Sequence, residues 1–422
     1  MMRAHRPNFE FFTIAVGRVA SLLAAVASLK LLTVYLSVEE FGRFGLALAG
    51  ANATAMLLFS AYGQGMFRFT NPLVERGQYS RLRHLLVTQL WQISLTIIAI
   101  SAVLITLVRS IFPNGPWTLV ALAVVAGLLL GIRIVQFNAI QAMRARKTAA
   151  LLQAISGFSG GLVGVPFALL ITPEGEWAMA GVIIFLIVLV IVQMIIVNQI
   201  ILLVAYKTAS SEVNSAPADE NFFQFCKPLV LVFGLTALAS YSDKFLAAEL
   251  LTLTEAAVLI AFLQIARSIS IMSVGITMQF IYPIVFAGTD RSEVIAKKRY
   301  RQVLIAWLLV LAGVGVVSLI VWGASEPLVR LLTTDAYTSF ASLLPSLIFA
   351  VALPQAARLL EAVGMRAYST NRYIIPKIIE AGAMILVLIL ALPTLGIWGV
   401  PIAYALSGLL LSIGYLIVNQ KV

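Results

Sequence analysis

Residues 177–205 read WAMAGVIIFLIVLVIVQMIIVNQIILLVA and contain no charged side chain. A helix needs about 20 apolar residues to cross the hydrocarbon layer of a bilayer, so this run is long enough to span it. Similar runs recur along the whole chain, separated by short charged or Pro- and Gly-containing breaks. We therefore predict an all-α polytopic membrane protein with about twelve transmembrane helices, at residues 11–36, 44–67, 84–108, 117–142, 148–171, 177–205, 222–250, 255–286, 301–323, 338–363, 370–391 and 396–419.

The composition excludes several other classes of protein. Hydrophobic residues make up 61% of the chain and charged residues 11%, whereas a soluble domain carries about 25% charged residues. The net charge of +11 lies mainly in loops between apolar runs, which indicates a membrane protein and not a nucleic-acid-binding one. Because the chain has one cysteine, Cys226, and two histidines, His5 and His84, we expect no metal site, disulfide framework or cofactor.

The distribution of Lys and Arg predicts the orientation. Of the two alternating sets of loops, one contains only Arg43, Arg109 and Arg330, whereas the other set and the tails contain most of the remaining cations. Positively charged loops stay on the cytoplasmic side of a membrane. We therefore expect both termini to lie in the cytoplasm.

The polar segment 207–221, KTASSEVNSAPADEN, divides the predicted spans into two sets of six. Lys30 followed by Glu39 and Glu40 in the first half is echoed by Lys244 followed by Glu255 in the second. We therefore expect an N-terminal six-helix bundle at 1–206, a cytoplasmic linker at 207–221 and a C-terminal six-helix bundle at 222–422. Many transporters are built from such repeats, with the substrate site at their interface.

Several cations fall inside predicted spans, where each costs about 2.5–3.5 kcal/mol at the bilayer centre. One interpretation is ion pairing with the nearby acids Asp243, Glu249, Glu361 and Glu380. The other is a water-filled cavity whose positive lining attracts an anionic substrate. The cations outnumber the acids, so we favour the cavity, lined by Arg18, Lys30, Arg133, Lys244, Arg267 and Arg358.

Polar residues at helical spacing are candidates for the wall of the same cavity. Gln89 and Gln92 share one face of the third span, and Gln264 and Arg267 share one face of the eighth. Hydrogen bonds between helices are the alternative explanation, since these are common in membrane proteins. Asp243 is a candidate for proton or cation coupling, or else a structural partner for a nearby arginine.

Three short motifs resemble a known family. They are GRV at 17–19 continuing to LSVEEFGRFG at 36–45, YGQGMFRF at 62–69, and SDKF at 242–245. These resemble the polysaccharide transporter branch of the multidrug/oligosaccharidyl-lipid/polysaccharide exporter superfamily, in particular Wzx-type O-antigen flippases. By motif position, the resemblance implies that Arg18, Lys30 and Lys244 line the lumen. We extend this assignment to Arg133, Arg267 and Arg358 from their burial cost.

The resemblance implies two six-helix bundles around a central cationic lumen that opens alternately to either side. The implied function is to flip oligosaccharide repeat units on an undecaprenyl pyrophosphate carrier to the outer leaflet of the bacterial inner membrane, for surface polysaccharide such as O-antigen or capsule. The implied partners are this substrate, membrane lipids, a polysaccharide polymerase and a chain-length regulator.

Two alternatives stay open at this point. A multidrug or cation antiporter would share the fold, but a lumen rich in Arg and Lys would repel a cationic substrate. A membrane-embedded polysaccharide polymerase or ligase would need catalytic groups, and the predicted outer loops are short and contain no histidine. We therefore expect a transporter and not an enzyme.

Overall fold

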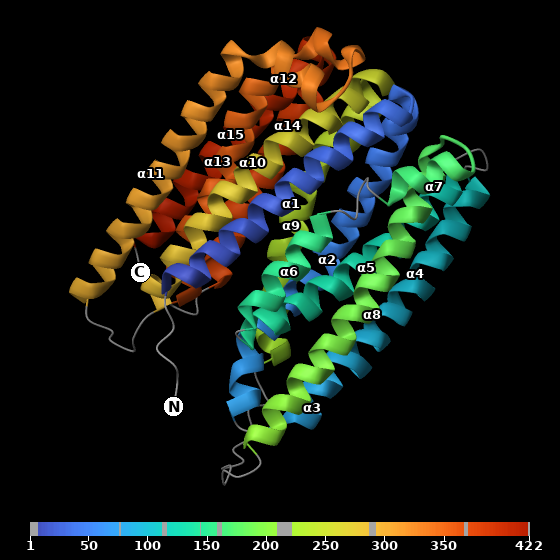
Figure 1. Ribbon diagram of the computed structural model, residues 1–422. Helices are drawn as coiled ribbons and strands as arrows, with labels where there is room; N and C mark the ends of the chain where they lie inside the picture. Colours follow the sequence, from blue (N-terminus) through green and yellow to red (C-terminus); the bar gives the residue numbers. More distant parts are fainter. Residues whose placement is uncertain are drawn as a thin grey trace. The chain divides into compact units, whose positions relative to one another are not determined.

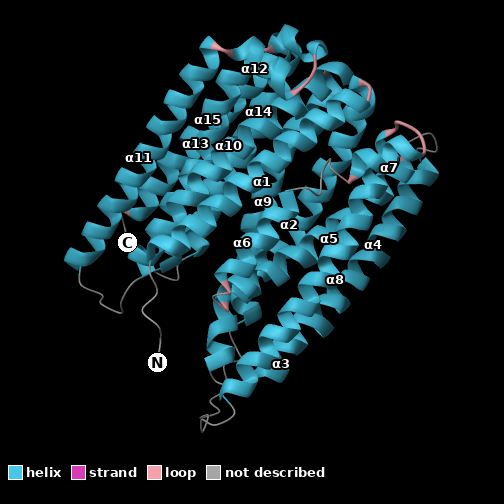
Figure 2. Cartoon of the chain, in the orientation of Figure 1, coloured by secondary structure: helices cyan, strands magenta, loops and turns pink. Residues whose placement is uncertain are grey.

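The computed structural model describes residues 7–75, 77–111, 116–143, 145–157, 163–208, 222–286, 293–366 and 370–420. These residues form helices joined by short loops, with no strand among them (Figure 2), so the predicted all-α fold is confirmed. In chain order the elements are α1 (Pro7–Tyr35), α2 (Val38–Glu75), α3 (Tyr79–His84), η1 (Leu85–Gln89), α4 (Leu90–Ile111), α5 (Trp117–Ala142), α6 (Arg146–Gly157), α7 (Gly164–Leu170), α8 (Gly175–Thr208), α9 (Phe222–Leu250), α10 (Leu253–Phe286), α11 (Glu293–Gly323), α12 (Ser325–Leu332), η2 (Asp335–Phe340), α13 (Leu343–Arg366), η3 (Thr370–Tyr373), α14 (Ile374–Leu395), η4 (Gly396–Trp398) and α15 (Gly399–Asn419) (Figure 1).

Nine segments of the described chain are long and apolar enough to cross a membrane. One of them, Asn371–Asn419, contains both α14 and α15, and Val19–Tyr35 in α1 is a shorter apolar helix. Helices α6 and α7 occupy the predicted span 148–171. The sequence did not predict α12, a short helix with Glu326 in its first turn and Arg330 in its last turn.

Helices α2 and α10 both begin with a Ser or Thr side chain that accepts a backbone N–H three residues later. In each case that residue is a glutamate of the weak internal repeat, Glu40 or Glu255. At the start of α2, the backbone N–H of Glu40 donates to Ser37 Oγ over 3.2 Å. At the start of α10, the N–H of Glu255 donates to Thr252 Oγ1, and the N–H of Thr252 donates back to Glu255 Oε2. This reciprocal pair is a capping box, which satisfies N–H groups that a helix leaves free at its first turn. Local helix initiation therefore explains the position of Glu255, whereas Glu40 takes part in its cap through the backbone N–H.

The described chain forms two compact units. The first comprises the chain up to Ala24 together with Ala47–Gly234, and the second comprises Ala25–Leu46 and Leu235–Val422. The hairpin formed by the end of α1 and the start of α2 thus belongs to the second unit, although the flanking turns of both helices belong to the first. The predicted linker at 207–221 stays a prediction, since residues 209–221 lie outside the described ranges.

In the first unit, α5 packs against α4, α6 and α8. The hydrophobic core of the first unit includes Phe59 and Met66 of α2, Val135 of α5 and Leu189 of α8, which are all buried. Gly131 permits close packing of α5, because a Cβ there would lie 2.1 Å from the ring of Phe59.

In the second unit, α13 is the central helix. It packs against α10, α11 and α15, and α15 packs in turn against α14 (Figure 1). Most of its membrane-spanning part, Leu343–Glu361, is buried. Since buried membrane helices exchange lipid contacts for protein contacts, polar residues on the helices around α13 can pair with one another inside the unit.

Candidate functional site

A cluster of charged and polar side chains lies inside the second unit, on three helices. Asp243 and Lys244 are adjacent on α9, Arg267 lies on α10 and Tyr404 on α15. Asp243 is fully buried, Lys244 is 6% exposed, and Tyr404 is also buried. Charged groups this deep in a protein must be paired or hydrogen-bonded, because transfer out of water is costly.

Asp243 is the acceptor at the centre of the cluster. Its Oδ2 accepts a hydrogen bond from Arg267 Nη2 at 3.0 Å and another from the hydroxyl of Tyr404 at 2.7 Å. Its Oδ1 accepts a hydrogen bond from the backbone N–H of Lys244 at 2.8 Å. Both oxygens of the carboxylate therefore accept hydrogen bonds, and Oδ2 pairs with Arg267. A role for Asp243 in ion coupling stays a prediction.

Arg267 on α10 donates hydrogen bonds to groups on both other helices of the cluster, α9 and α15. Its Nη2 also donates to the backbone carbonyl of Ser240 on α9 and to the hydroxyl of Tyr404 on α15. The guanidinium carbon lies 5.4 Å from the ring centroid of Tyr241, within the range of a cation–π contact. This arginine is therefore held by acceptors on two helices and by an aromatic face.

Lys244 is bound far less completely than Arg267. Its Nζ lies 3.8 Å from Asp243 Oδ1 and 5.2 Å from the ring centroid of Tyr241. This buried Nζ donates no hydrogen bond to any acceptor among the described residues. The cluster thus combines two cations with one carboxylate, and one of the cations has unused hydrogen-bond donors.

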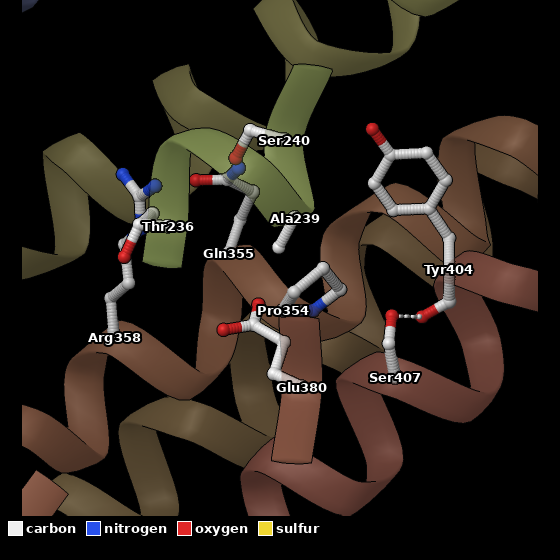
Figure 3. A pocket seen from close by; sticks show the side chains of 9 residues that line it. All are labelled: Thr236, Ala239, Ser240, Pro354, Gln355, Arg358, Glu380, Tyr404 and Ser407. Carbon is white, nitrogen blue, oxygen red and sulfur yellow. Dashed lines mark hydrogen bonds between the residues drawn. The ribbon is translucent and has the colours of Figure 1, made fainter. Parts of the chain in front are cut away.

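A small cavity lies next to this cluster (Figure 3). The space open to the centre of a water molecule is about 10 Å³, which is about enough for one water. Polar side chains from α9, α13, α14 and α15 converge on it, as Figure 3 shows, and Pro354 interrupts the hydrogen bonding of α13 at its wall. The lining residues are Thr236, Ala239, Ser240, Pro354, Gln355, Arg358, Glu380, Tyr404 and Ser407.

The same cavity touches a second buried ion pair. Lys377 Nζ donates to Glu380 Oε2 at 2.8 Å, three residues along α14, and both side chains are buried. Glu361 of α13 interacts electrostatically with this pair and with Arg358. The cavity therefore adjoins two charged groups of residues, one around Asp243 and one around Glu380.

The structure brings together four of the predicted site residues. Asp243, Lys244 and Arg267 form the cluster, and Arg358 lies at the adjacent cavity. Gln264, one turn before Arg267 on α10, is half-buried, and its backbone carbonyl accepts a hydrogen bond from Ser268.

Lys30 belongs to the second unit but has a different environment. Its Nζ donates to the backbone carbonyls of Arg330 and Thr333 at the C-terminal end of α12. A helix C-terminus carries a partial negative charge and free carbonyls, so it stabilises this cation in the way that an acidic side chain would. The assignment of Lys30 to a lumen stays a prediction.

The remaining predicted residues lie in the first unit. Arg133 is half-buried on α5, and its buried Nε has no hydrogen-bond partner within the described chain. Gln89 lies in the π-helical turn η1, where its Oε1 accepts a hydrogen bond from the Tyr62 hydroxyl at 3.3 Å. Gln92 is exposed on α4. Arg18 lies on α1, but its side chain is outside the described residues.

Sequence reasoning missed two parts of this site. Tyr404 is the only hydroxyl that contacts both Asp243 and Arg267 among the described residues, but a tyrosine in an apolar run carries no signal of its own. Lys377 is absent from the predicted site, whereas the structure buries it in α14 beside Glu380. The spacing of three residues between this lysine and glutamate was the available signal for an ion pair.

Comparisons with known proteins define the fold. No protein-family model matches the chain, and no curated protein matches it in sequence. Among solved structures, an inward-facing multidrug resistance MATE family transporter of the MOP superfamily matches with a TM-score of 0.63 and 12% identity, over 96% of this chain and 98% of that one.

Two further structures agree. The lipid II flippase MurJ, in an inward closed conformation, matches with a TM-score of 0.60 and 15% identity, over 98% of this chain and 87% of that one. A point mutant of the Vibrio cholerae MATE transporter VcmN matches with a TM-score of 0.58 and 15% identity, over 98% of this chain and 96% of that one. The chain is therefore a multi-pass membrane protein with the fold that these MATE transporters and MurJ share.

Proposed function

We propose that this protein is a flippase that moves undecaprenyl-pyrophosphate-linked oligosaccharides from the cytoplasmic to the outer leaflet of the bacterial inner membrane. The observation that carries the proposal is the excess of positive charge in the buried cluster around Asp243. Arg267 is neutralised by Asp243, whereas the Lys244 ammonium has no hydrogen-bond acceptor among the described residues. A buried ammonium with unused donors is suited to an anionic group such as a pyrophosphate.

The proposed mechanism is alternating access between two six-helix bundles, divided at 207–221. The pyrophosphate headgroup enters a lumen lined by Arg18, Lys30, Arg133, Lys244, Arg267 and Arg358, while the polyprenyl tail stays in lipid. Arginines that are already paired, as Arg267 is, bind the anion weakly enough for release. Gln89, Gln92 and Gln264 contact the sugars, and Asp243 links the cluster to the driving ion.

The fold also supports a second candidate function. Several of the matching structures are MATE transporters, and two of them are described as multidrug resistance transporters, so a drug or cation antiporter is compatible with the architecture. The buried cluster favours an anionic cargo instead, because a net positive site raises the energy of a bound cation.

Deletion of the gene separates the two functions. For a flippase, surface polysaccharide disappears and lipid-linked repeat units accumulate on the cytoplasmic side, while drug susceptibility is unchanged. An unaltered polysaccharide with increased drug susceptibility would favour the antiporter. Complementation with Lys244→Gln tests the role of the ammonium: polysaccharide is not restored, whereas Lys227→Gln, at an exposed lysine on the same helix, restores it.

A further inference from the structure

Helix α11 has one face packed against the protein and one face left open. Its buried residues recur at spacings of three, four or seven positions, which places them on one face that packs towards α13; they are Val303, Ala306, Val310, Val314 and Val321. The opposite face is apolar and exposed, with Ile305, Leu308, Leu309, Val316, Leu319, Ile320 and Trp322. In a membrane protein, such a face contacts lipid acyl chains.

On the N-terminal side of Ile305, the exposed face of α11 carries two cations, Lys298 and Arg301. Arg301 and Lys298 precede Ile305 by four and seven residues, which places all three side chains on one side of the helix. Both cations are exposed, and Lys297 beside them is exposed as well. Residues three apart on a helix have Cβ atoms about 5–6 Å apart, so Lys298 and Arg301 can contact one phosphate group together.

The orientation of the chain does not explain this arrangement. A bias of Lys and Arg towards one side of the membrane constrains which loops are basic, but not which face of a helix carries the cations. Here Lys298 and Arg301 stand in line with the apolar face of α11, whereas the half-buried Arg299 between them lies on the packed side. An anionic phospholipid has the matching form, a phosphate headgroup joined to acyl chains.

We propose that the outer face of α11 is a binding site for an anionic phospholipid of the surrounding bilayer, such as phosphatidylglycerol. Lys298 and Arg301 bind the phosphate, and the acyl chains lie along Ile305, Leu308 and Leu309. The site is separate from the charge cluster around Asp243 and does not depend on which substrate the protein transports. Each basic residue near a membrane surface strengthens the attraction to an anionic lipid about fivefold, so the pair contributes about 30-fold.

The test uses the purified full-length protein in a neutral detergent and titrates it with short-chain phosphatidylglycerol or phosphatidylcholine. Native mass spectrometry and the lipid-induced rise in thermal unfolding temperature report binding. The test variant is Lys298→Gln with Arg301→Gln. The matched control is Arg83→Gln with Lys227→Gln, which removes two exposed cations from two different helices. A swapped variant, Lys298→Arg with Arg301→Lys, keeps both charges.

The expected result is preferential binding of phosphatidylglycerol that weakens about 30-fold in the test variant and is retained in the control and swapped variants. An equal loss in the control variant would overturn the proposal, because attraction would then depend on total charge. Equal binding of the two phospholipids would overturn it too. If the test variant does not fold, the wild type and the swapped variant are compared at low and high salt. Their preference for phosphatidylglycerol must then weaken with salt, because the proposed headgroup contact is electrostatic.

Discussion

The ammonium group of Lys30 donates a hydrogen bond to the backbone carbonyl of Arg330, 3.0 Å away, at the end of α12. It also donates to the carbonyl of Thr333, which is fully buried. Nearby, the ring of Phe41 in α2 meets Tyr337 edge-on, with centroids 6.2 Å apart. Burial raises the pKa of the Tyr337 phenol above its ordinary value. The hairpin of α1 and α2 is therefore joined to α12 and η2 within the second unit.

Replacing Lys30 by Met tests whether this lysine has a structural role. The carbonyls at the end of α12 lose their donor, and the variant is expected to unfold with about 1–2 kcal/mol less stability. Thermal unfolding of the purified protein in detergent measures the change. Lys30→Arg retains a donor and is expected to recover most of the loss. A Lys30→Met protein of wild-type stability that fails in transport would instead assign the lysine to substrate.

The Tyr404 hydroxyl gives a second prediction. It bridges Arg267 and Asp243, so Tyr404→Phe removes a hydrogen bond from each while leaving the aromatic packing in place. We expect a loss of about 1–3 kcal/mol in unfolding free energy. Asp243→Asn should cost more, about 3–5 kcal/mol, because Arg267 then stays buried without its counter-charge. If the two substitutions cost the same, the charge of Asp243 contributes little beyond its hydrogen bonds.

Close packing of α2 on α10 gives a third prediction. A Cβ on Gly45 would lie 2.6 Å from Cγ2 of Ile260, so Gly45→Ala should destabilise the protein by about 1–3 kcal/mol. Ile260→Leu moves the branch away from Cβ, and the double variant should regain part of the loss. Gly382→Ala is the control, because a Cβ there meets nothing within 4 Å. That change should be neutral or stabilise α14 by up to about 1 kcal/mol. Equal losses at Gly45 and Gly382 would exclude the steric explanation.

The sequence predicted the helices well because membrane spans are marked by long apolar runs. The predicted limits of 117–142 and 222–250 coincide with α5 and α9. It could not predict α12, whose eight residues are too short and too mixed to resemble a span. The start of α13 at Leu343 was also missed, since the 3-10 turn η2 occupies the residues before it.

The candidate site was predictable only where a charge stood inside an apolar run. Asp243, Lys244 and Arg267 were identified in this way, and the structure places them together. Which arginine pairs with Asp243 could not be deduced, because it depends on how α9, α10 and α15 pack. Lys30 shows the same limit: its partners are backbone carbonyls about 300 residues away, which no side-chain pattern reveals.

Lys244 and Lys377 are both buried lysines of the second unit, and they should respond oppositely to the same substitution. Lys377 is paired with Glu380 at 2.8 Å, so Lys377→Met leaves a buried carboxylate unpaired and should cost about 3–5 kcal/mol. Lys244 has no hydrogen-bond acceptor within the described chain and lies near Arg267, which shares Asp243 with it. Lys244→Met therefore removes a repulsive and poorly solvated charge, and should stabilise the protein by about 1 kcal/mol. If Lys244 serves an anionic cargo, the same variant should lose surface polysaccharide in cells, because residues kept for function often reduce stability. The unfolding temperatures of both variants and the polysaccharide production of the same strains test this prediction. If Lys244→Met destabilises the protein as much as Lys377→Met does, the Lys244 ammonium is a structural partner and not a free site for an anion.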